Sequence, residues 1–256
     1  MELLAQVLGV SRGELPTVGT MSEAQHEQYA ALLDRRAARE PLQHLTGRAP
    51  FRHVELAVGP GVFVPRPETE LLAGWAVAAG RTMVSSVERP VVVDLGTGSG
   101  AIALAVATEA PATSVHAVEI DERAYAWASR NLAGTDVDLR LGDLVDAFRD
   151  LDGTVDVLVC NPPYLPLSDE PEVDPEVRDH DPAVALWSGQ DGLDAIRALE
   201  PVAARLLRSG GALGVEHSDR QGESAPAVFR GTGRWRDVKD HPDLAGRPRY
   251  LTASLC

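Results

Sequence analysis

A short apolar run that ends in Asn-Pro-Pro-Tyr constrains the fold of this chain more than any other stretch. Residues 155–159 are mostly aliphatic, the pattern of a strand buried on both faces of a parallel sheet. Pro162 and Pro163 have no N–H for a strand ladder and each fixes its own φ, so the chain after Asn161 is stiff and extended. The sequence therefore predicts a rigid polar segment, which also carries Tyr164, at the strand edge where open α/β sheets bind ligands.

A glycine-rich loop follows a second apolar strand, predicted over residues 91–95. Its members are Gly96, Thr97, Gly98, Ser99 and Gly100, and an apolar helix is expected directly after it, over 101–108. Alternate glycines let the backbone turn tightly and approach a ligand where no Cβ would fit. The loop departs from the dinucleotide-binding fingerprint because Ala103 stands in place of its third glycine. By itself the loop is weak evidence for a ligand.

Acidic residues stand at the ends of the next two predicted strands. Glu119 closes the strand at 115–118, about twenty residues past the loop, where a carboxylate can accept hydrogen bonds from ribose hydroxyls. Asp143 and Leu144 follow a third strand at 139–141 and suit contacts with an adenine ring. Each carboxylate alone could be a helix cap or a surface charge. Their joint placement, one at the end of each successive strand, indicates a cofactor that contains a nucleoside.

The first part of the chain is predicted to be a small helical appendage followed by a β-hairpin. Leucines recur at helical spacing within residues 2–46, and Ser22 with Gln25 has the pattern of a capping box. We expect one helix here to turn Tyr29, Leu32 and Leu33 inward. Arg35, Arg36 and Arg39 form the densest basic cluster, expected as a solvated face, with contact to a partner as the alternative. Residues 51–64 alternate around a Gly-Pro-Gly turn at 59–61, which predicts the hairpin.

The remaining elements are predicted from periodicity and from helix start and stop signals. Helices are expected at 67–79, 121–131 and 192–207, and further strands at 212–215, 235–238 and 250–253. Pro67 suits the first position of its helix, Gly80 suits its stop, and 81–90 is expected to be a linker. The acidic, proline-rich run at 165–181 is too polar to be expected to pack as an element. It is either a solvated loop or a lid that orders over the site.

Composition excludes several classes of function. With 38 acidic against 24 basic residues, the net charge of −14 disfavours attraction to phosphate backbones, so we expect no direct binding of nucleic acid. No apolar run is long enough for a membrane span and Met1 opens no signal peptide, so we expect a cytoplasmic protein. Histidines and cysteines lack metal-site spacing, and Cys160 is expected to be a buried small hydrophobe, with a nucleophile as the alternative.

Five motifs in one order resemble the HemK/PrmC family, glutamine-N5 methyltransferases of peptide-chain release factors. They are FVPRPETE, DLGTGSGAIALA, NPPY, DHDPAVAL and DGL, and the resemblance covers nearly the whole chain. It implies an α/β protein with a Rossmann-like, seven-stranded class I methyltransferase sheet whose last strand is antiparallel. A small N-terminal helical domain (residues 1–50) would be joined by the β-hairpin (51–64) to the methyltransferase domain (65–256).

The same resemblance implies a cofactor, a partner and a site. S-adenosylmethionine would contact the loop from Gly96 to Gly100, then Glu119, Asp143 with Leu144, and Asn161, and no metal would be needed. The segment from Asn161 to Tyr164 would hold a glutamine of a release factor, the protein partner. An amide nitrogen is a poor nucleophile because its lone pair is delocalised. The Asn161 side-chain oxygen and the Pro162 carbonyl would accept its two hydrogens while Tyr164 stacks on the amide plane.

Two other functions compete with this one. The same motif could methylate the amino group of adenine or cytosine in DNA or RNA, which would call for a basic groove or a recognition insertion. Alternatively, the chain could bind the cofactor without catalysis and use its appendage as an interaction surface. The sequence departs from the family pattern in two places: the appendage begins late, and EHSDRQ from Glu216 replaces a more glycine-bearing pattern. Both departures bear on docking of the substrate more than on the chemistry.

Overall fold

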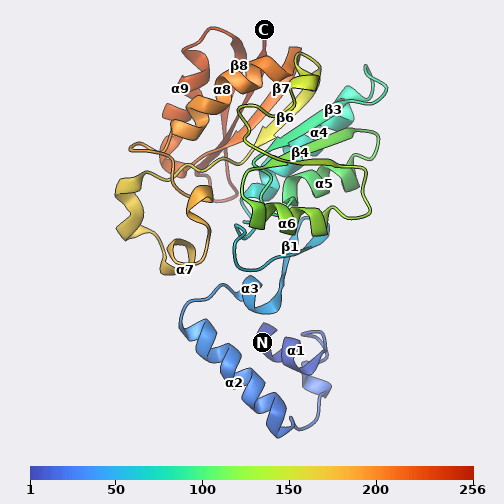
Figure 1. Ribbon diagram of the computed structural model, residues 1–256, viewed down its shortest axis with the longest axis vertical. Coiled ribbons are helices and arrows are strands. Elements are labelled where there is room, and N and C mark those ends of the chain that lie inside the picture. Colours follow the sequence, from blue (N-terminus) through green and yellow to red (C-terminus); the bar gives the residue numbers. More distant parts are fainter.

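A seven-stranded sheet with helices on both faces forms the larger part of the chain in the computed structural model, which describes residues 1–256 (Figure 1). The strand order is β5-β4-β3-β6-β7-β9-β8. The strands are β3 (Val91–Leu95), β4 (Ser114–Glu119), β5 (Asp138–Leu141), β6 (Val155–Cys160), β7 (Leu207–Glu216), β8 (Trp235–Pro242) and β9 (Pro248–Leu255). The last strand runs antiparallel to both of its neighbours, which confirms the expected sheet.

The order of the strands creates a crevice at one edge of the sheet. Connections from β3 lead to β4 on one side, whereas β6 lies on its other side, so the direction of winding reverses between β3 and β6. Such a switch point opens a ligand crevice at the carboxyl ends of the strands. Leu95 pairs with both Val118 and Cys160. The three strands therefore end side by side, which places the glycine loop, Glu119 and Asn161 next to one another at the carboxyl edge of the sheet.

Helices cover the two faces of the sheet and bury it on both sides. One face carries α4 (Thr69–Met83), α5 (Ala101–Glu109) and α6 (Glu122–Asn131), and the other carries α8 (Asp194–Leu206) and α9 (Ser224–Arg230). A separate apolar core lies on each face. Every residue of β6 is buried, as its apolar run predicts. None of the helices combines the length and the apolar character that crossing a lipid bilayer requires.

The N-terminal helices form a separate lobe at the opposite end of the molecule from the C-terminus (Figure 1). They are α1 (Glu2–Leu8), the 3-10 turn η1 (Leu15–Thr17), α2 (Glu23–Ala37) and α3 (Leu42–Thr46). The capping box is confirmed, since Gln25 N donates to Ser22 Oγ and Ser22 N donates to Gln25 Oε1. The inward placement of Leu33 is wrong: its side chain is 43% exposed, and no residue of α2 is fully buried.

The β-hairpin is present, but its turn lies earlier than predicted. It pairs β1 (Arg48–Phe51) with β2 (Val54–Ala57), and Arg52 takes a φ of 51° in the turn. This left-handed conformation usually selects glycine or asparagine, so the sequence carried no turn signal there. Gly59, expected in the turn, instead lies where a Cβ would come within 2.6 Å of the Trp127 ring. The chain just after the hairpin therefore approaches α6 closely at a glycine, while Phe51 and Leu56 of the hairpin pack in the core of the main body.

Two element boundaries also differ from those expected. Helix α4 begins at Thr69 and continues through Gly80 to Met83, which shortens the expected linker. Gly80 is a packing glycine, because a Cβ there would meet the Thr113 methyl group at 3.1 Å. Strand β7 begins at Leu207 rather than at 212, with a register shift opposite Val155.

The acidic segment after Tyr164, residues 165–188, does form structure, so the expectation that it is too polar to pack is wrong. It contains η3 (Leu167–Glu172), α7 (Pro175–Arg178) and η4 (Ala183–Ala185). Its two ends are joined, because Leu165 N donates to Leu186 O and Ser188 N donates to Leu165 O, both at 2.9 Å. The segment also pairs with the basic cluster of α2: the guanidinium of Arg36 lies 2.6 Å from Glu176 and that of Arg39 lies 2.5 Å from Asp174. The cluster is therefore only partly a solvated face.

Candidate functional site

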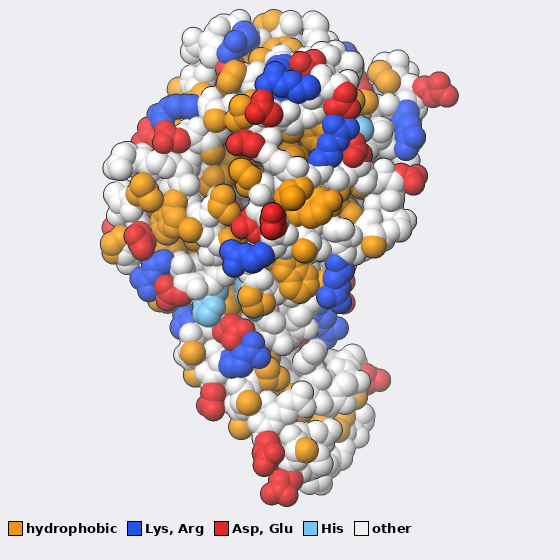
Figure 2. Space-filling view, in the orientation of Figure 1, with side chains coloured by type: hydrophobic (Ala, Val, Ile, Leu, Met, Phe, Trp, Pro, Cys, Tyr) orange, Lys and Arg blue, Asp and Glu red, His pale blue; other side chains and the backbone are white.

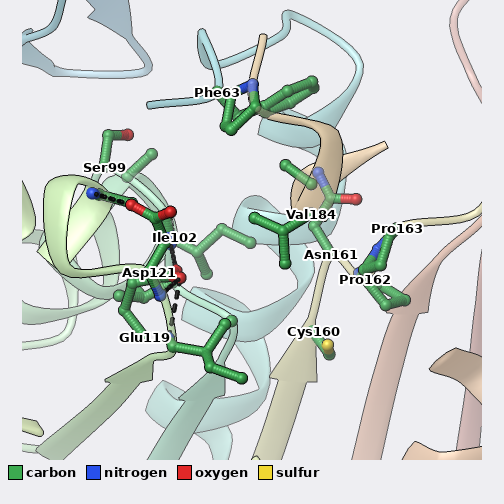
Figure 3. Close-up of a pocket in the computed structure, with 18 of the residues that line it drawn as sticks. Phe63, Ser99, Ile102, Glu119, Asp121, Cys160, Asn161, Pro162, Pro163 and Val184 are labelled. Carbon is green, nitrogen blue, oxygen red and sulfur yellow. Dashed lines mark hydrogen bonds between the residues drawn. The ribbon is translucent and has the colours of Figure 1, made fainter. Parts of the chain in front are cut away.

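A cavity of about 250 Å³ lies at the carboxyl edge of the sheet, at the switch point between β3 and β6 (Figure 3). Figure 3 shows Ser99 and Glu119 on one side and the Asn161–Pro163 segment on the other, with Phe63 towards the top and Val184 near Asn161. We call the first side the cofactor wall and the second the acceptor wall. Of the residues expected in the site, the lining includes Gly96, Thr97, Gly98, Ser99, Glu119, Leu144, Asn161, Pro162 and Pro163.

The glycine loop presents open backbone to the cavity. Gly96 and Gly98 have φ values of 71° and 59°, and a Cβ on either would meet no protein atom within 4 Å. Asp94, at the end of β3, holds the loop from behind: its Oδ2 accepts a hydrogen bond from Thr97 Oγ1 at 2.6 Å and from Ala103 N at 3.2 Å. Its Oδ1 has no partner, and burial raises the pKa of Asp94 to about 7. The loop is thus fixed by side-chain and main-chain contacts that leave its cavity side free.

Glu119 lies on the cofactor wall and is tied to the backbone around it. Its Oε2 accepts from Gly98 N at 2.8 Å, and its Oε1 accepts from Ile120 N and Asp121 N at 2.9 Å. Burial raises the pKa of this carboxyl, while the three N–H donors oppose the rise. Three of roughly four acceptor positions on the carboxylate are therefore filled, which leaves capacity for a ligand hydroxyl.

Asn161 and Pro162 line the acceptor wall at the end of β6. The Asn161 side chain donates from Nδ2 to Thr69 Oγ1 at 3.3 Å. Thr69 is the first residue of α4 and is only 4% exposed. The proline pair keeps the following backbone extended, so the amide of Asn161 is anchored at both its main chain and its side chain.

Tyr164 does not line the cavity, in contrast to its expected stacking role. Its hydroxyl donates to Glu216 Oε1 at 3.3 Å, and its backbone carbonyl accepts from Gln221 Nε2 at 3.1 Å. Burial raises the pKa of Tyr164 well above its ordinary value. A buried carboxylate at the end of β7 thus turns the ring away from the acceptor space, a contact that NPPY alone does not reveal.

Two other expected contact residues also lie outside the cavity lining. Gly100 has a φ of 83° and packs on α6, where a Cβ would come within 3.2 Å of Leu132 Cγ. Asp143 is exposed and accepts from Val145 N at 2.9 Å, whereas its neighbour Leu144 reaches the cavity. Packing against α6 therefore accounts for a glycine at position 100, and the contact with Val145 N accounts for the Asp143 carboxylate.

Two segments that the sequence analysis quoted only as motifs supply the rim of the cavity. Their lining residues are Phe63, Pro65 and Thr69 from FVPRPETE, and Pro182, Val184 and Ala185 from DHDPAVAL. Arg66 joins the two segments, since its guanidinium lies 2.5 Å from Asp181 Oδ2 and 4.9 Å from the centre of the Phe63 ring. Burial raises the pKa of Asp181 to about 6. Both motifs were visible in the sequence, but only the fold shows that they meet.

Cys160 lines the cavity beside Asn161 and is fully buried, as expected. Burial, with Asp94 and Glu119 nearby, raises the pKa of the thiol well above its ordinary value. A nucleophilic cysteine needs thiolate character. This environment favours the small hydrophobe over the nucleophile.

Comparisons with known proteins agree with this architecture. A family model described as the PrmC N-terminal domain matches residues 1–47, and one described as the methyltransferase small domain matches residues 78–173. Among solved structures, a methyltransferase from Pyrococcus furiosus superposes with a TM-score of 0.54 at 18% identity, covering 90% of this chain and 98% of that one. At this identity the likeness shows the methyltransferase fold alone.

Curated relatives are much closer in sequence. The release factor glutamine methyltransferase of Streptomyces coelicolor is 57% identical over 98% of this chain and 88% of its own length. The protein of the same name from Mycolicibacterium smegmatis is 46% identical with the same coverage. The 4-amino-L-phenylalanine/4-methylamino-L-phenylalanine methyltransferase of Streptomyces pristinaespiralis is 41% identical over 94% of this chain and 82% of its length. On its fold, its site and these identities, the chain belongs to the release factor glutamine methyltransferase (HemK/PrmC) family.

Proposed function

We propose that this protein transfers a methyl group from S-adenosylmethionine to the side-chain amide nitrogen, N5, of a glutamine in a peptide-chain release factor. The observation that carries the proposal is the placement of Asn161 and Pro162 on one wall of a cavity whose opposite wall holds the glycine loop and Glu119. The 57% identity to a protein named for this reaction supports it. A release factor as substrate also agrees with the cytoplasmic location expected from the sequence.

The cofactor wall fits S-adenosylmethionine. Gly96 and Gly98 leave room for the amino-acid part of the cofactor, and Glu119 retains capacity for a ribose hydroxyl. Ile102 and Leu144 give an apolar surface for the adenine. When bound there, the cofactor supplies a methyl group activated by its sulfonium charge.

The acceptor wall fits a planar NH₂ group. Asn161 Oδ1 and the Pro162 carbonyl are two acceptors on one rigid segment, so they can take both N–H groups of a glutamine amide. These hydrogen bonds position the nitrogen and draw its lone pair away from the carbonyl. Positioning supplies most of the rate in this scheme, and the proton can leave after the transfer. A carboxylate would present oxygen lone pairs to the same acceptors and be rejected.

The charge of the protein favours a protein substrate over a nucleic acid. The net charge is −14, and on the face shown in Figure 2 the Lys and Arg side chains are interspersed with Asp and Glu. A polyanion gains little from such a surface, because its binding depends on a group of phosphate contacts. Methylation of adenine or cytosine in DNA or RNA is therefore the weaker reading of the same acceptor motif.

A second candidate substrate is a free aromatic amine. One relative, at 41% identity, is named for 4-amino-L-phenylalanine, which also carries an NH₂ group on a plane. Asn161 and Pro162 could bind either acceptor through the same two hydrogens. The greater identity to the release factor enzymes favours the glutamine.

Incubation with radiolabelled S-adenosylmethionine tests the proposal. We would compare an intact release factor, the same factor with its acceptor glutamine changed to glutamate, 4-amino-L-phenylalanine, and DNA and RNA. We expect label only in the intact release factor. Equal labelling of both factor proteins, or labelling only of the aromatic amine or of nucleic acid, would overturn the assignment.

A further inference from the structure

We infer that Thr69 and Glu216 are positioning residues that set which way the side-chain amide of Asn161 points. Thr69 lines the cavity at the start of α4, and Glu216 lies behind the acceptor wall at the end of β7. Their role rests on the proposed function, because the direction of the amide matters only if Asn161 accepts a hydrogen from the acceptor nitrogen. Thr69 stands within the PRPETE motif and Glu216 opens the EHSDRQ departure, so both belong to motifs without a role so far.

A line of contacts leads from the cavity to Glu216. Asn161 Nδ2 donates to Thr69 Oγ1 at 3.3 Å, and the Thr69 hydroxyl lies close enough to the Glu216 carboxyl to lower its pKa. The Tyr164 hydroxyl donates to Glu216 Oε1 at 3.3 Å, whereas Oε2 has no partner that meets hydrogen-bond geometry. Thr69 and Glu216 are 4% and 1% exposed. Water therefore has little access to compete with these contacts.

The donor and acceptor capacities of these side chains determine the direction of the hydrogen bonds between them. An ionised carboxylate can only accept, and the partnerless Oε2 of Glu216 is a buried acceptor open to the single proton of the nearby Thr69 hydroxyl. The lone pairs of Thr69 then remain for the NH₂ group of Asn161, as the structure shows. Its other end, Oδ1, is left to accept a hydrogen from the substrate. With the amide reversed, its NH₂ group would face the N–H groups of the acceptor, donor against donor.

The charge of Glu216 determines whether these hydrogen bonds keep this direction. Burial raises its pKa to about 7, while Thr69, Arg249 and Tyr164 lower it and Glu68 raises it. Cys160, also nearby, is neutral because burial raises the pKa of its thiol. Once protonated, the Glu216 carboxyl can donate a hydrogen bond itself, so the Thr69 hydroxyl is no longer required to donate to it. The orientation of Asn161 is therefore expected to weaken as the pH falls through about 7.

Substitution of Thr69 tests the role through activity. Thr69→Val keeps the shape but removes the hydroxyl, and we expect kcat on the release factor to fall about tenfold or more while the cofactor Kd changes less than about twofold. Thr69→Ser restores the hydroxyl and should recover most of the rate. Thr82→Val is the matched control, since the Thr82 hydroxyl on the same helix bonds only to Ala78 O. If Thr69→Val folds, binds cofactor and keeps its rate within about twofold, Thr69 does not position Asn161.

Nuclear magnetic resonance tests the same role without turnover. The chain has two asparagines, Asn131 and Asn161, so selective ¹⁵N-asparagine labelling gives two side-chain NH₂ groups. Asn131 serves as the internal reference, because its NH₂ group donates to Ala57 O and Ser99 O at 2.9 Å. We expect the Asn161 signals to shift with pH through about 7 in the wild type and to stop shifting in Glu216→Gln. Asn161 signals that stay fixed in the wild type, or shift equally in Glu216→Gln, would overturn the role of Glu216.

The two experiments separate this inference from the proposed function. A wild-type protein that labels no release factor contradicts the proposed function, whatever the asparagine spectra show. A wild-type protein that labels the factor, together with an unaffected Thr69→Val variant, contradicts only the positioning role.

Discussion

The two walls of the cavity are held in place by different kinds of contact. On the cofactor wall, Glu119 is fixed by backbone N–H groups of Gly98, Ile120 and Asp121. On the acceptor wall, the Asn161 side chain donates a hydrogen bond to Thr69. The NPPY segment is held by the hydrogen bond from the Tyr164 hydroxyl to Glu216. On the first wall, the groups that hold Glu119 are main-chain donors, which do not titrate, and the titratable Asp94 lies behind the glycine loop. The second depends on side chains from distant segments and on the charge of one buried carboxyl.

This difference predicts how cofactor binding and the rate of transfer should respond to substitutions in each wall. Fixed backbone donors hold the cofactor wall ready in the same geometry before and after the reaction, so losses there should weaken binding uniformly. In the proposed function the acceptor wall would orient the atom that reacts, so losses there should appear in the rate of transfer. Each prediction below breaks or sharpens this contrast.

The largest effect is expected for Asn161→Ala. In the proposed function the change removes one of the two acceptors that would orient the substrate nitrogen, which should cost a few kcal/mol in the transition state. Transfer at saturating cofactor should nearly vanish, while the thermal unfolding midpoint and the cofactor Kd from calorimetry change little. A variant that keeps more than about a tenth of the wild-type rate, a loss under about 1.4 kcal/mol, would show that Asn161 does not play this role.

Glu119→Ala should give the opposite pattern. In the proposed function the carboxylate would contact ribose hydroxyls that do not change during the reaction, so we expect the cofactor Kd to rise about tenfold or more while kcat at saturating cofactor stays within about threefold. Glu122→Ala, which removes an exposed carboxylate three residues along the chain, is the control and should leave Kd unchanged. Unchanged cofactor affinity in calorimetry of Glu119→Ala would reassign this residue to holding the loop.

Each wall also contains a buried carboxyl that should make stability fall as pH rises. Burial raises the pKa of Asp94 from 3.8 and of Glu216 from 4.5, each to about 7. Between about pH 4 and 7 the folded state thus binds more protons than the unfolded state, so the unfolding free energy decreases across this window. Urea unfolding at pH 5.5 and 8 should show a smaller difference, by up to a few kcal/mol, in Asp94→Asn and in Glu216→Gln than in the wild type. Identical pH dependence in all three proteins would contradict the raised pKa values.

The smallest effect is expected for Arg39→Ala, outside both walls. The ion pair of Arg39 with Asp174 is about half exposed on each side, so its loss should leave the unfolding free energy almost unchanged. Arg66→Ala is the contrasting variant, because it leaves the buried Asp181 without its partner and should cost more. Equal losses in the two variants would show that burial does not set the strength of these pairs.

The grouping of Gly96, Gly98 and Glu119 around one cavity could be predicted from the sequence because its signals are local. A strand, a glycine loop and an acidic residue about twenty positions later follow from periodicity and spacing, and the structure places Gly96, Gly98 and Glu119 around one cavity. The seven-stranded sheet was expected from the family resemblance, and β3 and β6 also carry their own apolar runs, whereas β5 and β8 do not. Gly100 and Asp143 were the exceptions, and in both the nearest contact lies outside the motif.

The acceptor wall was predicted only in part because most of its contacts join residues far apart in sequence. NPPY identified the rigid segment, but the contact of Tyr164 with Glu216 spans 52 positions and that of Asn161 with Thr69 spans 92. No periodicity encodes such pairs. The predicted position of the hairpin turn was wrong for a local reason instead, because Arg52 adopts a positive φ that its residue type does not signal.

A crystal structure of the complex with S-adenosylhomocysteine and the release factor tests the central claim most directly. We expect the acceptor glutamine in the cavity, with its amide nitrogen within about 3 Å of both Asn161 Oδ1 and the Pro162 carbonyl and facing the cofactor sulfur. The cofactor product should lie against Gly98 and Glu119. A glutamine bound elsewhere, or one whose carbonyl oxygen faces Asn161, would contradict the assignment of the two walls.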